Sequence, residues 1–292
     1  MKFQSKKPAF EYLRNKWGIR HKASQNRFWD KHGEVFKQVA VGSLGGLMLL
    51  TPAKQPTVQN HLFTSREDAL LGYDKNVLLA HELSDKVPEE IRPLEKEEEK
   101  EITDILSLNF GFKVIPEVDS IRLNRNYGLI GGEQHLYRYP GDNLYAHAET
   151  STDWAKYGSA GIAPGLGAWG YFVPSKEEFS EIDKKRERYY LAIQTFLVPG
   201  YAENVTKYRD FFKFRKMLVV NPKTGQSVVA VIGDAGPAEW TGKHLGGSPE
   251  VMDGLGLGKG PRQGAVLYFF IDDPENKIPL GPVKAQERIA QI

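Results

Sequence analysis

From about residue 113 onward, short apolar runs alternate with clusters of Gly, Pro and Asn, a pattern that favours a β-rich body over a helical bundle. Asn221–Gly225 predicts a hairpin turn, and Ser248 before Pro249–Leu255 predicts an N-capped helix of two turns. The runs are rich in β-branched and aromatic residues, which is typical of strands. They are Tyr189–Thr195, Met217–Val220, Ser227–Ile232 and Ala265–Ile271.

A basic N-terminus precedes an uncharged apolar segment. Residues 1–37 carry ten Lys and Arg against three acidic residues, a balance of +7, so the remainder of this +2 chain carries −5. The apolar core, Val39–Leu50, is shorter than the roughly 20 residues of a membrane span but fits the apolar part of a signal peptide. With its positive flank it predicts export, either cleaved after Thr51–Ala53 or kept as an anchor. The alternative is a buried core helix behind a basic surface helix.

The chain therefore divides into four expected parts. Residues 1–53 form the basic N-terminus and leader, and residues 54–112 form a polar and charged linker with a short helix over Ile102–Phe112. Residues 113–283 form the Gly- and aromatic-rich β domain, in which Glu177–Arg188 predicts an exposed helix. Residues 284–292 are a tail.

Composition limits the chemistry. The chain has no Cys, which excludes disulfides, thiolate metal sites and thiol nucleophiles, so any metal site must use His and carboxylates. The usual zinc-hydrolase spacing His-Glu-x-x-His is absent, and we expect no metal and no cofactor. The mildly acidic body also argues against nucleic-acid binding.

The densest signal for chemistry surrounds Asp234. The Ser227–Ile232 strand runs into Gly-Asp-Ala-Gly-Pro, which forces a sharp turn and presents the Asp234 carboxyl at the strand end. A partly desolvated carboxyl has a raised pKa and can donate a proton to a leaving oxygen. The alternative is an Asp that only caps the turn.

Residues 217–271 follow a recognisable order of features, which extends weakly back to about 160. The order is a strand, an Asp-x-Gly-Pro turn, a Gly, a Ser-capped helix, a Leu-Gly pair and a closing strand. Its matching segments are Gly225–Ile232, Asp234–Pro237, Gly242, Ser248–Pro249, Leu255–Gly256 and Gly264–Val266. This pattern resembles the double-psi β-barrel superfamily of rare lipoprotein A domains, expansins and the lytic transglycosylase A barrel. The resemblance implies a mainly β (α+β) fold with short helices and a barrel core over about 160–273.

The same resemblance implies action on cell-wall glycan, with Asp234 as acid and then base on the glycosidic oxygen. The chain departs from the superfamily at Gly246, where these domains usually carry an Asp. Leu191–Thr195 also lacks the His that rare lipoprotein A domains have after their first barrel strand. Glu239 and His244 lie close enough in sequence to assist Asp234.

Two further stretches suit a sugar-binding cleft, in which planar polar groups bond hydroxyls and aromatic rings cover sugar faces. The polar candidates follow a Gly-Gly pair and the aromatic candidates lie in Gly-rich loops; the alternatives are a structural turn with a buried His and a loop packed into the barrel. These candidates are Glu133, Gln134, His135, Arg138, Trp169 and Trp240.

Three hypotheses remain open. The first is an exported enzyme that cleaves wall glycan with Asp234, and a single carboxylate suits lytic cleavage better than two-carboxylate hydrolysis. The second is a catalytically silent module that binds peptidoglycan or another surface polysaccharide, which the missing Asp at Gly246 favours. The third is a metal-dependent amidase or peptidase built on His135, His147 and His244. In the first two, the partners are the glycan and, through the N-terminal segment, the cytoplasmic membrane.

Overall fold

The computed structural model describes residues 75–286, which belong to the second of two units, Met1–Thr64 and Ser65–Ile292. The predicted leader lies outside the described residues, as does most of the predicted tail. Across residues 75–286, no helix combines the length and the apolar character that crossing a bilayer requires.

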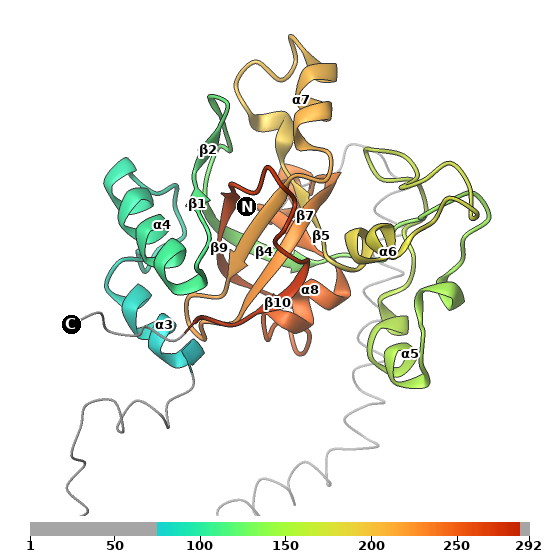
Figure 1. The fold of residues 1–292 in the computed structure, drawn as a ribbon, viewed down its shortest axis with the longest axis horizontal. Coiled ribbons are helices and arrows are strands. Elements are labelled where there is room, and N and C mark those ends of the chain that lie inside the picture. The colour runs from blue at the N-terminus through green and yellow to red at the C-terminus, as the bar shows by residue number, and fades with distance from the viewer. Residues whose placement is uncertain (1–74, 287–292) are drawn as a thin grey trace, which may run out of the picture. The chain divides into compact units, whose positions relative to one another are not determined.

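Six strands close into a β-barrel (Figure 1). Around the wall the order is β4, β8, β5, β7, β6, β9 and back to β4, with β4–β8 and β5–β7 parallel and the other neighbours antiparallel. This barrel with a few short helices confirms the expected mainly β, α+β class. The strands are β4 (Tyr127–Gly132), β5 (Tyr190–Ile193), β6 (Lys216–Val220), β7 (Ser227–Ala235), β8 (Leu245–Gly247) and β9 (Gln263–Ile271).

The four apolar runs expected as strands are β5, β6, β7 and β9, and the turn at Asn221–Gly225 joins β6 and β7 into an antiparallel hairpin. The expected helix is α8 (Pro249–Gly254). The Ser248 side chain accepts a hydrogen bond from the backbone N–H of Val251 and so caps this helix. This part of the chain is thus set locally by β-branched runs and turn residues.

The barrel interior is filled by alternate residues of its strands. Val219, Ala230, Ile232 and Phe270 are fully buried and point into one apolar cluster. Their strand neighbours, among them Leu218, point to the opposite face, as the two-residue period of a strand requires. The wall is therefore apolar on both sides over much of its area and needs an outer cover.

Helices α3 (Lys75–Ser84) and α4 (Lys96–Phe110) cover one part of the outer wall and lie side by side there (Figure 1). Their buried apolar side chains form one cluster with outward-facing residues of the barrel strands. Leu79, Leu83, Ile102, Leu106 and Phe110 pack against Leu218, Val229 and Phe269 of the barrel.

The charge run expected as linker supplies the first half of α4. Glu95 and Glu98 form a capping box at its start, and Gly111 ends it in the left-handed conformation. Glu99 is buried and pairs with Arg122 at 2.6 Å. The expected helix over Ile102–Phe112 therefore begins earlier and is part of the packed body.

A second outer layer comes from the chain between β4 and β5. It contains η2 (Leu144–His147), α5 (Ser151–Tyr157), η3 (Gly158–Ala160) and α6 (Glu181–Arg188), with α5 and α6 on the side of the barrel away from α4 (Figure 1). Leu136, Phe172, Tyr190 and Ala192 form its apolar contact with the wall. The remaining elements are β1 (Val114–Ile115), β2 (Glu117–Val118), β3 (Ile121–Arg122), η4 (Thr195–Leu197), α7 (Val205–Phe212), η5 (Glu239–Thr241) and β10 (Gly281–Val283).

We predict that a chain beginning at Ser65 unfolds cooperatively, whereas one beginning at Lys113 is unstable or aggregates. The second loses α3 and α4, whose buried apolar side chains each contribute roughly 1.5–3 kcal/mol. Together, the five buried side chains Leu79, Leu83, Ile102, Leu106 and Phe110 approach the whole free energy of unfolding of a typical domain, about 5–15 kcal/mol. Thermal unfolding of the two truncated chains beside the full chain checks this. An equally stable Lys113 chain would show that the α3–α4 cover is dispensable.

Candidate functional site

Asp234 lies near the end of β7, and its side chain points out of the barrel. Its neighbour Ala235 packs toward the interior cluster, and its cross-strand partner Ala192 belongs to the outer apolar cluster. Residues opposite each other on neighbouring strands project to the same face. The carboxyl therefore faces the segment that joins β4 to β5.

The Asp234 carboxyl is held by backbone groups alone. Its Oδ1 accepts hydrogen bonds from the N–H of Ala168 at 2.6 Å and of Ala235 at 2.8 Å. Within residues 75–286, neither a cation nor a side-chain donor pairs with it. Burial raises the pKa of Asp234, and the two N–H donors lower it by less, so the pKa lies above its ordinary value.

A row of paired residues connects Asp234 to Gly246. Asp234 pairs with Ala192 on β5, and Ala192 pairs with Gly246 on β8. All three positions share the outer face of the wall. Two strand spacings separate Asp234 from Gly246, which is about 10 Å between their backbones.

The Glu133 side chain occupies the space beside Gly246. A Cβ atom at Gly246 would lie 2.4 Å from Glu133 Cγ and 2.4 Å from its Oε1, so these positions cannot both carry side chains in this conformation. The parallel pairing of β4 and β8 brings Glu133 there, and its N–H donates to the Gly247 carbonyl at 2.8 Å. Lys243 Nζ forms an ion pair with Glu133 and lies 3.1 Å from its Oε1. A carboxylate is therefore present where the resemblance leads one to expect an Asp side chain, but it comes from another strand.

Glu239, Trp240 and His244 form no hydrogen bond with Asp234. Glu239 and Trp240 form η5 and are exposed, Trp240 to 88%. His244 lies beside β4, where its Nδ1 accepts from the Leu129 N–H at 2.9 Å and its Nε2 lies 2.8 Å from Arg125. Burial and the Arg125 charge lower the pKa of His244, which keeps the ring neutral.

Trp169 and Arg138 are buried in this structure. Trp169 joins the interior apolar cluster, and its indole N–H donates to the Ile232 carbonyl, so the ring packs as the alternative interpretation of its loop anticipated. Arg138 donates two hydrogen bonds to Asp142 and lies over the Phe179 ring. Gln134 is exposed and offers its carbonyl to the Tyr190 hydroxyl.

A second group of polar side chains is buried between the outer layer and the barrel. Glu187 of α6 lies between His135 and His147, with its Oε1 3.2 Å from His135 Nδ1 and its Oε2 3.1 Å from His147 Nδ1. His147 Nε2 lies 3.0 Å from Asp142, which Arg138 holds. His135 and His147 thus come together as expected for a metal site, but with Glu187 rather than His244 as the third member.

This buried group is balanced in charge. Burial opposes ionisation of Glu187, but the hydrogen bonds from His135 and His147 outweigh it and lower its pKa to about 2. Burial also opposes the His147 charge, but Asp142 and Glu187 raise the pKa of His147 to about 9. Arg138 holds the pKa of Asp142 well below its usual range despite burial. Two cations therefore face two anions at neutral pH.

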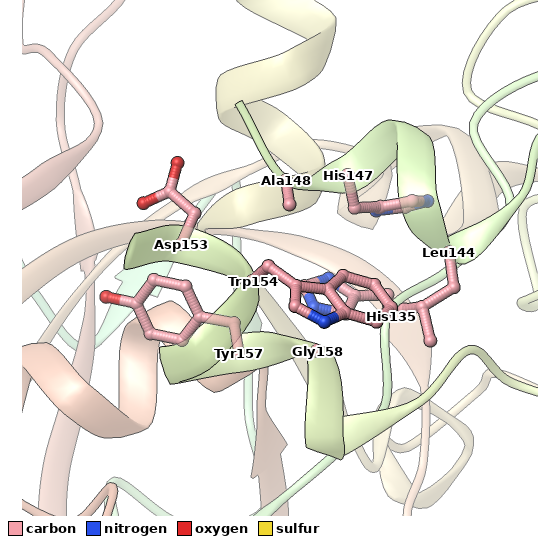
Figure 2. Close-up of a pocket in the computed structure, with 8 residues that line it drawn as sticks. All are labelled: His135, Leu144, His147, Ala148, Asp153, Trp154, Tyr157 and Gly158. Carbon is pink, nitrogen blue, oxygen red and sulfur yellow. The ribbon is translucent and has the colours of Figure 1, made fainter. Parts of the chain in front are cut away.

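A small hollow opens beside this group (Figure 2). Figure 2 shows the His135 and His147 rings in its wall, next to the Trp154 indole, and Leu144 at its edge. The Tyr145 ring stacks on Trp154 at 4.8 Å between centroids and is largely exposed. Both imidazoles therefore border a space of about the size of one water molecule.

No known protein-family profile, curated protein or solved structure matches this chain. The geometry of its own residues therefore carries the functional argument.

Proposed function

We propose that this protein is an extracytoplasmic enzyme that cleaves cell-wall glycan, with Asp234 as general acid and base and Glu133 as the second carboxylate. The observation that carries the proposal is the placement of both carboxyls on one outer face of the barrel. Among the described residues no cation pairs with Asp234, and Glu133 fills the place left by Gly246.

The two carboxyls have different surroundings, as a proton donor and its negatively charged partner require. Burial favours the protonated form of Asp234, whereas Glu133 is paired with the Lys243 ammonium group. Two carboxyls in such different surroundings can share acid and base roles in glycoside cleavage. Protonated Asp234 gives its proton to the glycosidic oxygen as the bond from the sugar carbon to that oxygen breaks. The Glu133 carboxylate then stabilises the positive charge that develops on the sugar.

The nucleophile that completes the reaction decides between two outcomes. In lytic cleavage a hydroxyl of the same sugar attacks the carbon and returns its proton to Asp234. In hydrolysis a water molecule attacks and loses its proton to a carboxylate. The masses of the products decide between the two outcomes, because lytic products lack one water relative to hydrolytic ones.

The resemblance to the double-psi β-barrel superfamily supports the choice of a glycan as substrate. Of the element order that carries the resemblance, the structure has β7 running through Asp234 to Ala235, then Gly236–Pro237, α8 and β9. The exposed Trp240 and the Tyr145–Trp154 stack offer aromatic faces of the kind that cover sugar rings.

The alternative is a binding module on the same barrel without catalysis. The missing Asp at Gly246 favours this alternative, but Glu133 supplies a carboxylate at the same place. If the protein is only a binding module, it should bind wall glycan and release no soluble products. A cleavage assay therefore separates the enzyme from the binding module.

We predict that Asp234→Asn abolishes cleavage and leaves stability at pH 7 no lower than in the wild type. Asn keeps an oxygen for the Ala168 and Ala235 N–H donors but cannot exchange a proton, and acid–base assistance is worth about 10²–10⁴-fold. Because the Asp234 pKa is raised, its contribution to stability is full below pH 3.8 and is lost as pH rises through the folded pKa. The neutral Asn therefore costs nothing at pH 7.

Mass spectrometry of the products from purified wall, with thermal unfolding alongside, checks this prediction. Asp210→Asn, an exposed position on α7, is the matched control and is expected to behave as wild type. Lytic products lack one water relative to hydrolytic ones. Full activity in Asp234→Asn would remove Asp234 from the site, and absence of cleavage by the wild type would favour the binding module.

We predict that the body of the protein lies outside the cytoplasm, because the basic residues 1–37 precede the uncharged Gln38–Ala53 segment. A reporter that works only outside the cytoplasm, joined after residue 60, should be active. Changing the basic residues of positions 1–37 to Gln should lower that activity. Activity confined to a reporter that works only in the cytoplasm would contradict export.

A further inference from the structure

The buried group around Glu187 presents three ligand atoms to one point. One ring nitrogen of His135, one ring nitrogen of His147 and one carboxylate oxygen of Glu187 lie within 4.8 Å of one another, and the three residues are almost fully buried. A tetrahedral zinc ion with bonds of about 2.0–2.1 Å holds its ligand atoms about 3.3 Å apart. Each Glu187 oxygen already lies at about that distance from one ring, Oε1 at 3.2 Å from His135 Nδ1 and Oε2 at 3.1 Å from His147 Nδ1.

The surroundings orient these ligands as the outer groups of a metal site do. His147 Nε2 lies 3.0 Å from Asp142, and ligating imidazoles commonly direct their second ring nitrogen to a carboxylate. Asp142 is itself fixed by two hydrogen bonds from the Arg138 guanidinium. The Leu136 N–H donates to Glu187 Oε1 at 3.1 Å and fixes that carboxylate.

Two observations point to an occupant beyond these side chains. His135 and His147 border the hollow beside Trp154, which leaves one side of the group open. Glu250, buried nearby at the start of α8, has an Oε2 atom without a hydrogen-bond partner among the described residues. Both features are those of a site that accepts a further polar or cationic group.

We propose that His135, His147 and Glu187 bind one divalent transition-metal ion of the zinc class, with its remaining position open toward the hollow. Two imidazoles favour zinc and its neighbours over calcium or magnesium, which prefer oxygen alone. Two His and one Glu with an open position is a ligand set of catalytic rather than purely structural zinc sites. This proposal stands independently of the glycan-cleaving function, whose Asp234 and Glu133 are not ligands.

Zinc binding to the full chain tests the site directly. Protein freed of metal with a chelator and then titrated with Zn²⁺ by calorimetry should bind one equivalent. His147→Ala and Glu187→Gln should each weaken binding by at least about tenfold. His81→Ala changes an exposed His on α3, outside the ligand group, and is the matched control that should bind as wild type does.

Nuclear magnetic resonance of the imidazole nitrogens in the wild type keeps the test valid if a buried variant fails to fold. Zinc should shift the Nδ1 resonances of His135 and His147 and leave that of His244 in place. No stoichiometric binding by the wild type would overturn the proposal. So would undiminished binding by a folded His147→Ala variant, or zinc binding with unchanged His135 and His147 signals, because the metal would then lie elsewhere.

Discussion

Gly246 has no side chain, and the Glu133 side chain lies in the space where one would project. This contact depends on the parallel pairing of β4 with β8, which closes the barrel and sets Glu133 beside Gly247. The outer face of the barrel then carries a fixed carboxylate two strands away from Asp234. The proposed chemistry rests on this packing relationship more than on any single residue.

The outer layer between β4 and β5 buries polar groups against the barrel wall. Its Gly167–Ala168 backbone closes over Asp234, and its buried group around Glu187 holds the layer against the wall. A closed barrel with a wholly apolar cover would be more stable but chemically inert. Here the cover instead buries charged groups in pairs, which is costly unless each charge has its partner.

The local features of the fold were predictable from the sequence. Alternating β-branched runs, the Asn221–Gly225 turn and the Ser248 cap each depend on neighbouring residues, and the structure confirms all three. The sharp turn expected at Gly233–Pro237 begins later, because β7 continues through Asp234 and ends at Ala235. The charge run before Ile102 was less informative, because Glu99 meets its partner Arg122 only once α4 packs on the barrel.

Only part of the site could be predicted from the sequence, because the pairing register of the strands brings its other residues together. Lys243 and Glu133 are 110 residues apart, and no local pattern places them together. Glu187 lies in a charged helix whose composition predicts a solvated face, yet it is buried between two imidazoles. In the sequence, the hint of this burial was that Glu187 stands within a run of basic residues. Trp169 illustrates the converse, since composition cannot distinguish a sugar platform from a core side chain.

Moving the second carboxylate from position 133 to position 246 would test its proposed partnership with Asp234 directly. Cleavage of purified wall glycan would be measured for the wild type, Glu133→Ala and the double variant Glu133→Ala with Gly246→Asp. The Ala at position 133 vacates the space that the new aspartate side chain then enters. We expect Glu133→Ala to lose at least about tenfold in rate and the double variant to recover most of it. Full activity in Glu133→Ala, or a folded double variant no more active than Glu133→Ala, would contradict the role of Glu133 as the second carboxylate.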